Sequence, residues 1–342
     1  SGDYPIYGAS GYIGNTNFYH QEKPYVAVVK DGAGVGRAAL YPANSSVIGT
    51  MQYLLPKDNV LPKYLFYVVS YMHLEKYFTG ATIPHIYFKD YKNEEFNLDL
   101  LERQAEIVEI LEKCEKIIEK RKQEIQLLDQ LIKARFVEMF GNPVLNDKGW
   151  EQKSLGEITT KIGSGATPKG GKEAYQEEGI TLIRSMNVHN GQFEYKDLAH
   201  ISDEQASKLD NVTIEEDDVL LNITGASVAR SCVVPNEILP ARVNQHVCII
   251  RCKDCIIPEF LNKLLIDDNY QDLLWSIAGS GATRESITKQ QVENLQIILP
   301  MLELQKEFMA FCHQVTKSKV VVQKALDETQ LLFDSLMQQY FG

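Results

Sequence analysis

The chain has 342 residues, 44% of them hydrophobic, and a formal net charge of −11. This length predicts two domains, each large enough to bury a core. No run approaches the ~18 apolar residues of a membrane span, and six scattered cysteines favour a reducing cytoplasm over a disulfide framework. Because the chain is acidic, any contact with DNA must come from local basic patches or depend on a partner.

Residues 1–98 are predicted to form a β-rich domain that carries 13 of the 17 tyrosines. The β-rich run Tyr25–Val29 leads into the glycine-rich segment Lys30–Arg37, and Gly49–Leu55 reads as another strand. Pro62–Tyr77 is predicted to be a helix. The expected product is a small domain of short strands with one helix.

A long helix is predicted over residues 99–141, where apolar residues recur three and four positions apart. Good helix formers fill the other positions, and Gly141 followed by Pro143 ends the pattern. A helix of about 42 residues spans roughly 60 Å at ~1.5 Å per residue, which is more than one small domain can cover. The alternative left open is that this helix serves only its own domain.

Residues 142–299 show the same order of parts. The segment Thr224–Arg230 matches the Gly32–Arg37 segment in kind, so Arg37 and Arg230 are expected at equivalent loop ends. Strands are expected at Ile180–Arg184 and Val243–Arg251, and a helix at Pro258–Trp275. The predicted domain over residues 1–98 has no counterpart of residues 150–172. We therefore expect the start of that domain to be missing.

The long helix occurs twice. A shift of 201 residues aligns residues 80–141 with 281–342 without a gap, giving 14 identities over 62 positions. A second long helix is therefore predicted over residues 300–342, and two helices with matching apolar stripes should pack on each other. The stripe residues expected at helix contacts or partner docking are Leu111, Ile118, Ile125, Ile132, Phe311, Val315, Val322, Leu326 and Phe333.

The sequence contains no recognisable catalytic motif. Residues 165–173 look like a phosphate-binding loop, but Glu173 stands where such a loop needs Ser or Thr. The alternative is a mobile basic loop that touches a phosphate backbone. Cys252 and Cys255 form a single C-x-x-C pair, for which a structural role is favoured over zinc binding. The chain is therefore predicted to hold no cofactor and no metal.

Loops that contain glycine, arginine and amide side chains are better suited to binding DNA. Glycine lets the backbone approach a surface, arginine binds phosphate or guanine, and amides read adenine. The alternative is that these side chains cap turns and satisfy buried backbone groups. The DNA-binding candidates are Lys30, Gly34, Arg37, Thr82, His85, Thr167, Lys169, Lys172, Arg184, Asn187, Asn222, Thr224, Ser227, Arg230, Asn244, Gln245, Thr283 and Arg284.

Several short motifs occur in a fixed order around the repeated helix: Leu155–Ile158, Gly165–Pro168, Asp218–Leu221, Val243–His246 and Pro300–Gln305. In this order and duplication, the chain resembles the specificity subunit of Type I restriction–modification systems. The resemblance covers nearly the whole chain. One departure is Asp99, which stands where the family usually has a proline.

The resemblance implies an α+β fold with a pseudo-two-fold internal repeat. Two β-rich target recognition domains, 1–98 and 142–299, would each be followed by a spacer helix, 99–141 and 300–342, and the helices would pack as an antiparallel coiled coil. Each domain would read one half of a bipartite double-stranded DNA target. The helices would set the spacing of the half-sites and dock two DNA methyltransferase subunits.

The resemblance also implies that restriction and translocase subunits join this assembly. S-adenosylmethionine, ATP and magnesium would belong to the partner subunits, and the chain would be non-catalytic by itself, without contact to a membrane. The alternative function is a non-DNA adaptor with two interaction modules on a coiled-coil spacer.

Overall fold

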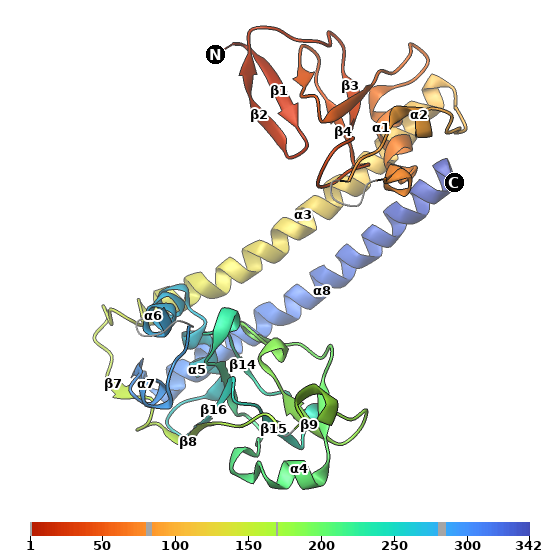
Figure 1. The fold of residues 1–342 in the computed structure, drawn as a ribbon. Coiled ribbons are helices and arrows are strands. Elements are labelled where there is room, and N and C mark those ends of the chain that lie inside the picture. The colour runs from red at the N-terminus through yellow and green to blue at the C-terminus, as the bar shows by residue number, and fades with distance from the viewer. Residues whose placement is uncertain (1, 80–83, 169, 280–284) are drawn as a thin grey trace. The chain divides into compact units, whose positions relative to one another are not determined.

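The computed structural model describes residues 2–79, 84–168, 170–279 and 285–342 (Figure 1). It divides into two compact units, of which unit 1 comprises residues 1–126 and 320–342 and unit 2 comprises residues 127–319. Each unit therefore combines one β-rich block with part of each long helix, a grouping that the linear order of blocks and helices does not reveal.

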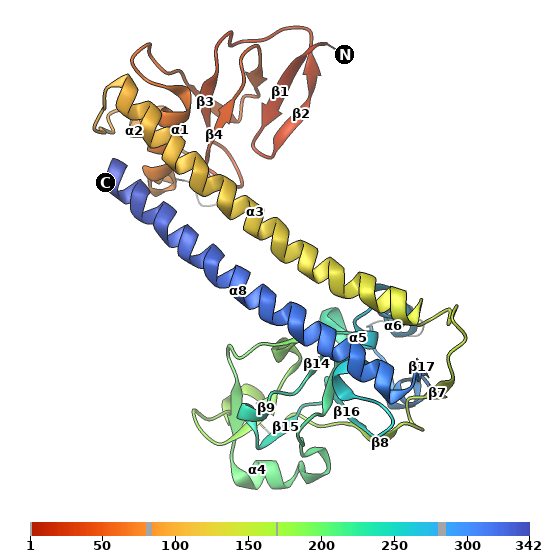
Figure 2. The same ribbon diagram turned by 180° about the vertical axis from the view of Figure 1, so that it is seen from behind.

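The two long helices are α3 (Leu101–Phe140) and α8 (Leu302–Phe341), each of 40 residues (Figures 1 and 2). Their bounds confirm the two predicted helices to within two residues. In unit 1, Leu111 near the start of α3 shares a hydrophobic cluster with Met337 near the end of α8. In unit 2, Phe140 at the end of α3 lies 5.4 Å, between ring centroids, from Phe308 near the start of α8. The helices are therefore antiparallel, and the alternative in which each serves only its own domain is wrong.

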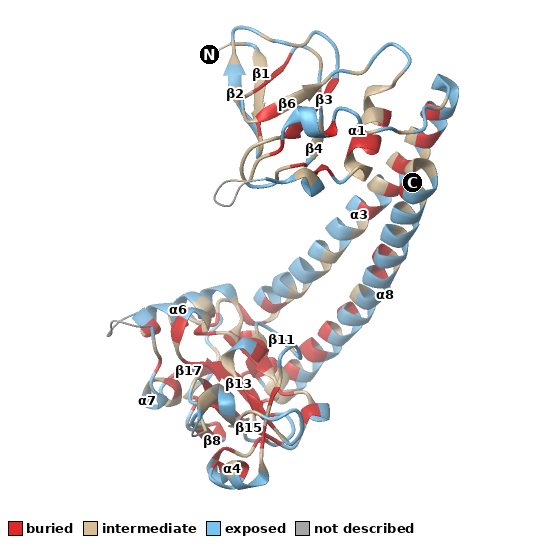
Figure 3. Cartoon of the chain, turned by 45° about the vertical axis from the view of Figure 1, so that its right-hand side comes forward, coloured by how far each residue is buried: buried red, intermediate tan, exposed pale blue. Residues whose placement is uncertain are grey.

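Buried residues recur along both long helices (Figure 3), although residues 119–135 of α3 are half-buried or exposed. An apolar stripe removed from water in this way is what stabilises helices of such length. The stripe residues that are buried are Leu111, Ile118, Val315, Val322 and Leu326, and those that are half-buried are Ile125, Ile132, Phe311 and Phe333.

Unit 1 contains two three-stranded sheets. In the first, β3 pairs antiparallel with β4 on one side and β6 on the other. In the second, β1 pairs antiparallel with β2 and parallel with β5. The strands are β1 (Tyr4–Gly8), β2 (Gly11–Thr16), β3 (Tyr25–Val29), β4 (Ala38–Tyr41), β5 (Ser46–Val47) and β6 (Met51–Leu54).

The helices of unit 1 beside α3 and α8 are short. The predicted helix over Pro62–Tyr77 is divided into α1 (Pro62–Tyr71) and a 3₁₀ turn (Leu74–Tyr77), because His73 adopts a left-handed conformation with φ +50°. The helix α2 (Phe88–Tyr91) follows. Tyr67 of α1 donates a hydrogen bond to Glu115 of α3 (2.8 Å), which ties α1 to the long helix.

Unit 2 is built around the four-stranded antiparallel sheet β14-β13-β16-β8. A second sheet has the order β12-β9-β15, and the pairs β10-β11 and β17-β7 complete the unit. The strands are β7 (Gln152–Ser154), β8 (Thr159–Ser164), β9 (Ile180–Ile183), β10 (Val188–His189), β11 (Gln192–Phe193), β12 (Ala199–Ile201), β13 (Val219–Asn222), β14 (Ser231–Val233), β15 (Ala241–Val243), β16 (Val247–Cys252) and β17 (Gln296–Ile298).

Two predicted elements of unit 2 are divided. The predicted strand over Val243–Arg251 is interrupted at residues 244–246, where Asn244 Oδ1 accepts a hydrogen bond from the His246 N–H (3.0 Å) and forms a turn. The predicted helix over Pro258–Trp275 is two helices. The helices of unit 2 beside α3 and α8 are α4 (Asp203–Ser207), α5 (Pro258–Leu265), α6 (Asp268–Gly279) and α7 (Lys289–Glu293).

The two units repeat the same strand plan. The order β4-β3-β6 of unit 1 corresponds to β14-β13-β16 of unit 2, with antiparallel pairing throughout. The order β2-β1-β5 corresponds to β12-β9-β15, with one antiparallel and one parallel pair in each. This repetition, with the two packed helices, confirms the predicted α+β fold.

A buried glutamine anchors each long helix to its own unit. In unit 1, Gln104 accepts a hydrogen bond from the Leu61 N–H (2.8 Å) and donates to the carbonyls of Asn59 and Asp99. Leu61 directly precedes the helix α1, so the glutamine joins the start of α1 to the start of α3.

Unit 2 repeats this arrangement. Gln305 accepts from the Ile257 N–H (2.9 Å), directly before α5, and donates to the carbonyls of Cys255 and Pro300. The identical glutamines of the sequence repeat therefore occupy identical structural positions.

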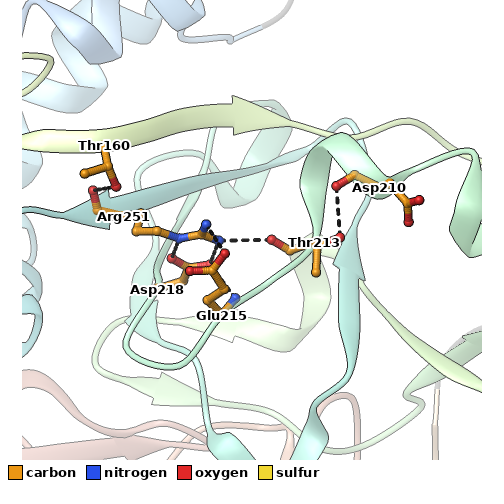
Figure 4. A network of polar contacts seen from close by, with 6 residues as sticks. All are labelled: Thr160, Asp210, Thr213, Glu215, Asp218 and Arg251. Atoms are coloured by element: carbon orange, nitrogen blue, oxygen red, sulfur yellow. Dashed lines mark hydrogen bonds and ion pairs between the residues drawn. The ribbon is translucent and has the colours of Figure 1, made fainter.

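The acidic run Glu215–Asp218 belongs to an internal polar network (Figure 4). Arg251 on β16 binds the fully buried Asp218 through Nε to Oδ1 and Nη2 to Oδ2, both at 2.8 Å. The same guanidinium contacts Glu215 and donates to the Thr213 carbonyl (3.0 Å). Two of the four acids are therefore neutralised inside unit 2.

Within the described ranges, the structure contains no helix that is both long and apolar enough to cross a lipid bilayer.

Candidate nucleic-acid interface

The loop between β3 and β4 of unit 1 is held by backbone hydrogen bonds at its base. The Val29 N–H donates to the Arg37 carbonyl (3.0 Å), and the Gly36 N–H donates back to the Val29 carbonyl (2.8 Å). Gly36 has φ +87°, and a Cβ there would lie 2.4 Å from the Glu75 nitrogen, so only glycine fits. The loop therefore ends with Arg37 in a defined place.

The loop between β13 and β14 of unit 2 has the same base. The Asn222 N–H donates to the Arg230 carbonyl (2.8 Å), and the Ala229 N–H donates back to the Asn222 carbonyl (2.9 Å). Arg37 and Arg230 are thus structural equivalents, as the sequence predicted from their places at the loop ends.

Each loop also rests on the backbone that follows the Gly-Ala-Thr segment. In unit 1, the Gly32 N–H donates to the Pro84 carbonyl (2.9 Å). In unit 2, the Gly225 N–H donates to the Glu285 carbonyl (2.9 Å). Pro84 and Glu285 are related by the 201-residue shift of the sequence repeat. One backbone scaffold therefore carries both loops.

The side chains on this scaffold differ. In unit 1, Asp31 contacts His85 Nδ1, and the exposed Arg37 donates to the Ala9 carbonyl. Gly34 is exposed with φ +82°, and Lys30 is half-buried. The unit 1 candidates that the structure describes thus lie on this loop or directly beside it.

In unit 2, three candidates, Thr224, Ser227 and Arg230, converge on an open hollow of about 410 Å³. Within the part of the chain that the structure describes, the Arg230 guanidinium forms no hydrogen bond or ion pair. Ser185 and Met186 also line the hollow, and the sequence did not single them out, because only the folded chain brings them there. His246 lines it as well; the sequence placed it in the Val243–His246 motif but not among the DNA-binding candidates.

Two further candidates are linked to this hollow by side-chain contacts through His246. Thr167 and Gln245 are both exposed, and Thr167 Oγ1 donates a hydrogen bond to Gln245 Oε1. His246 follows Gln245 and lies 2.5 Å, from its Nδ1, to Thr224 Oγ1. Loops that are far apart in the sequence are therefore connected by side-chain hydrogen bonds.

Three asparagine candidates are buried and bind the backbone. Asn222 Nδ2 donates to the Ser185 carbonyl (2.8 Å), and Asn187 Nδ2 donates to the Glu194 carbonyl (3.0 Å). Asn244 shapes the turn before β16. These side chains perform the alternative role considered for them, and in this arrangement they do not face solvent.

Arg184 is also engaged inside its unit. Its guanidinium lies 5.2 Å from the centroid of the Tyr175 ring, and Nη2 donates to the Asp197 carbonyl. Arg184 and the three asparagines therefore serve the interior of unit 2.

The remaining candidates cannot be placed. Thr82, Lys169, Thr283 and Arg284 lie outside the described residues, and so does the side chain of Lys172.

The described residues contain no group of three or more His, Cys, Asp or Glu side chains suited to hold a metal ion. Burial raises the pKa of the Cys252 thiol to about 12, which disfavours the thiolate that zinc requires.

Comparison with known protein families identifies the chain. Residues 1–128 and 147–328 match the family described as the Type I restriction modification DNA specificity domain. The chain belongs to this family. It is accordingly a specificity subunit of a Type I restriction enzyme, which is itself non-catalytic and acts in DNA recognition.

Individual relatives agree with this assignment. The Type I restriction enzyme MjaIX specificity subunit of Methanocaldococcus jannaschii is 24% identical over 307 residues, covering 83% of this chain and 69% of that protein. The S subunit of a Type I restriction–modification system from M. genitalium has a similar fold, with a TM-score of 0.62 at 16% identity, covering 100% of this chain and 89% of that one.

A further solved chain comes from work on complex assembly and conformational transition of the type I system. It has a TM-score of 0.64 at 17% identity and covers 98% of this chain and 90% of that chain. At such identities these likenesses support the fold, while the family match decides against the non-DNA adaptor. Specificity subunits of this family carry no cofactor themselves and assemble into a Type I complex.

Proposed function

We propose that residues 1–98 and 142–299 each read one half of a bipartite DNA duplex target. The observation that carries this proposal is the repeated loop scaffold, which presents different side chains in the two units. Asp31, with its partner His85, occupies the position that Thr224 takes in unit 2, since both follow the same pattern of backbone hydrogen bonds. Two equivalent loop scaffolds that carry different side chains suit two domains that recognise different base sequences.

In unit 1 the proposed contacts come from Lys30, Arg37 and the backbone at Gly34. In unit 2 they come from Thr224, Ser227, Arg230, Thr167 and Gln245. Arginine suits both phosphate and the O6/N7 edge of guanine. Glutamine and the hydroxyl side chains suit base edges in the major groove, where each good bidentate contact discriminates by about 1–3 kcal/mol.

The net charge of −11 makes the partner subunits part of the proposal. Phosphate neutralisation provides much of the affinity of a DNA-binding protein, and an acidic chain can supply only part of it. We infer that two methyltransferase subunits clamp the duplex and carry S-adenosylmethionine. Restriction and translocase subunits with ATP and magnesium then join the assembly, which acts in the cytoplasm.

The long helices have outward-facing residues suited to docking equal partners. Leu131 and Leu332 are identical in the sequence repeat and are 46% and 53% exposed. Leu131 belongs to unit 2 and Leu332 to unit 1, so each unit presents one equivalent apolar point. An exposed leucine repeated at equivalent positions supports two equivalent docking sites. The helices also set the spacing of the half-sites in this proposal.

The test is a methylation assay on random-sequence duplex DNA. The chain is co-expressed with its methyltransferase, and modified adenines are mapped by sequencing. We expect a split motif in which one half changes when residues 142–299 are replaced by those of another specificity subunit. A matched exchange of residues 1–98 should change only the other half. A motif that is indifferent to both exchanges would contradict the proposal.

A further inference from the structure

We propose that Gln245 reads one base pair of the half-site recognised by unit 2, and that His246 is a positioning residue that fixes the orientation of its amide. This inference rests on the proposed recognition of DNA by residues 142–299 and deepens it. It assigns the reading of one base to a relay of four side chains, Thr224, His246, Gln245 and Thr167.

The relay connects three loops of unit 2. Thr224 follows β13, Gln245 and His246 form the turn between β15 and β16, and Thr167 lies on the loop after β8. The contacts run from Thr224 Oγ1 to His246 Nδ1 (2.5 Å), from His246 Nε2 to Gln245 Nε2 (3.1 Å), and from Thr167 Oγ1 to Gln245 Oε1. Both ends of the Gln245 amide are therefore held.

These contacts do not use the whole hydrogen-bonding capacity of the Gln245 amide. A glutamine amide has two N–H donors and two lone pairs on its oxygen. The relay uses one hydrogen on Nε2 and one lone pair on Oε1, which leaves one donor and one acceptor. Gln245 is exposed, and its neighbour His246 lines the 410 Å³ hollow with Thr224 and Arg230. The free donor and acceptor are therefore available to a ligand that approaches the exposed Gln245 beside its neighbour His246.

The relay also has a defined proton order. Because Gln245 Nε2 can only donate, His246 Nε2 must accept, and the proton of a neutral imidazole then lies on Nδ1 and is donated to Thr224 Oγ1. Thr167 donates to Gln245 Oε1. Reversing the amide requires the opposite imidazole tautomer and the rotation of both hydroxyls. The amide orientation therefore changes only together with three other groups.

A fixed amide matters for base recognition. Adenine presents the N7 acceptor and the N6 amino donor in the major groove, and one amide orientation matches this pair. An amide that is already oriented loses less freedom on binding and rejects the reversed pattern. We therefore expect adenine at the base pair that Gln245 contacts.

Unit 1 has no such relay among its described residues. Lys30 N–H donates to the Thr50 carbonyl where Ile223 N–H donates to the His246 carbonyl, so Thr50 is the equivalent of His246. Gly49 is then the equivalent of Gln245 and has no side chain. Among the described residues, the relay therefore belongs to unit 2.

The experiment measures methylation by the assembled complex on a library of duplexes randomised at each position of the unit 2 half-site. Three variants are compared with the wild type: Gln245→Glu, which keeps the acceptor and removes the donor, His246→Phe, which keeps a ring without nitrogens, and Thr224→Val, which removes only the hydroxyl. Thr160→Val is the control, because Thr160 lies on β8 and bonds only the Arg251 carbonyl.

We expect Gln245→Glu to shift the preference at one base pair from adenine towards cytosine by ~10–100-fold. His246→Phe should relax the preference at that same base pair and leave the others unchanged. Thr224→Val should relax it there as well, and any further change should be confined to a base pair that Thr224 itself contacts. A purely structural role would instead lower methylation of all sequences together. Thr160→Val should match the wild type.

The proposal is overturned if the three variants act at different base pairs, or if none changes a base preference. If thermal melting shows that His246→Phe does not fold, Gln245→Glu and Thr224→Val still decide the outcome. If the wild-type complex gives no motif that depends on residues 142–299, the proposed function itself has failed, and that result differs from any failure of the relay.

Discussion

Gln104 and Gln305 make the same contacts in the two units, and both are fully buried. We predict that Gln305→Leu lowers the free energy of unfolding by about 2–3 kcal/mol, because it leaves the Ile257 N–H and two carbonyls without partners. Gln104→Leu should cost a similar amount. Urea denaturation measures both.

The matched control for these variants is Gln123→Leu, since Gln123 is exposed on α3 and bonds only Glu119 on the same helix. It should change stability by less than about 0.5 kcal/mol. Equal losses for buried and exposed glutamines would contradict the anchoring role.

Asp218 is fully buried and depends on Arg251 for its neutralisation. We predict that Asp218→Asn destabilises the protein by about 3 kcal/mol, because it removes the buried carboxylate that binds the Arg251 guanidinium through two atoms and leaves only the exposed Glu215 as its charge partner. Chemical denaturation measures the loss. The double variant Asp218→Leu with Arg251→Met should be more stable than Asp218→Asn.

A surface ion pair provides the comparison. Glu204→Gln breaks the exposed pair with Lys208 and should cost less than about 1 kcal/mol. If Asp218→Asn costs no more than this, the network in Figure 4 does not stabilise the unit.

We predict that the stability of unit 2 depends on alkaline pH, in part because of three cysteine thiols. Burial raises the pKa values of Cys232, Cys248 and Cys252 to about 12, whereas an unfolded thiol titrates near ~8.5. Between these values the unfolded chain loses protons that the folded chain keeps, so the free energy of unfolding falls as pH rises. The contribution is fully present below about pH 8.5.

Urea denaturation at pH 7, 9 and 10 measures this trend. Replacing the three cysteines with alanine should reduce the slope between pH 9 and 10. An unchanged slope would show that other groups cause it.

At the scale of elements, each long helix has one face packed against the other long helix and another face exposed to solvent. We predict that Leu131→Asp and Leu332→Asp weaken binding of the methyltransferase while leaving the melting temperature nearly unchanged, because both leucines are exposed. Binding is measured by titration calorimetry with the purified methyltransferase. Each single variant should remove one of two equivalent sites.

Leu111→Asp is the informative contrast, because Leu111 is buried in the cluster with Met337. It should lower the melting temperature strongly, since a charge replaces a core side chain. If Leu131→Asp and Leu332→Asp both retain methyltransferase binding, the proposed docking role of these leucines is contradicted.

At the scale of the whole molecule, the antiparallel pair makes the helix length a common property of both spacers. We predict that inserting seven helical residues into α3 after Gln126, together with seven into α8 after Lys319, lengthens the unspecified gap of the DNA target. Seven residues add about 10 Å, which corresponds to about three base pairs. Mapping of methylated adenines should show unchanged half-sites. An unchanged gap would contradict the role of the helices as spacers.

Much of the architecture was accessible without the structure. The apolar period of 3.6 and the 201-residue repeat predicted α3, α8 and their packing, because both signals are properties of a one-dimensional pattern. The equivalence of Arg37 and Arg230 followed from the order of strands and loops. The candidate site was predicted only in part: Thr224, Ser227 and Arg230 do converge on one hollow, and Asn187, Asn222 and Asn244 instead serve the backbone.

The sequence by itself determined that two similar blocks alternate with two copies of one long helix, because periodicity and repetition are written along the chain. Tertiary structure alone decided that each unit takes part of both helices, and which side chains of a loop face solvent. An asparagine in a loop has the same composition whether it caps a turn or reads a base. Only the carbonyls that other segments bring beside it, such as that of Ser185 beside Asn222, decide between the two.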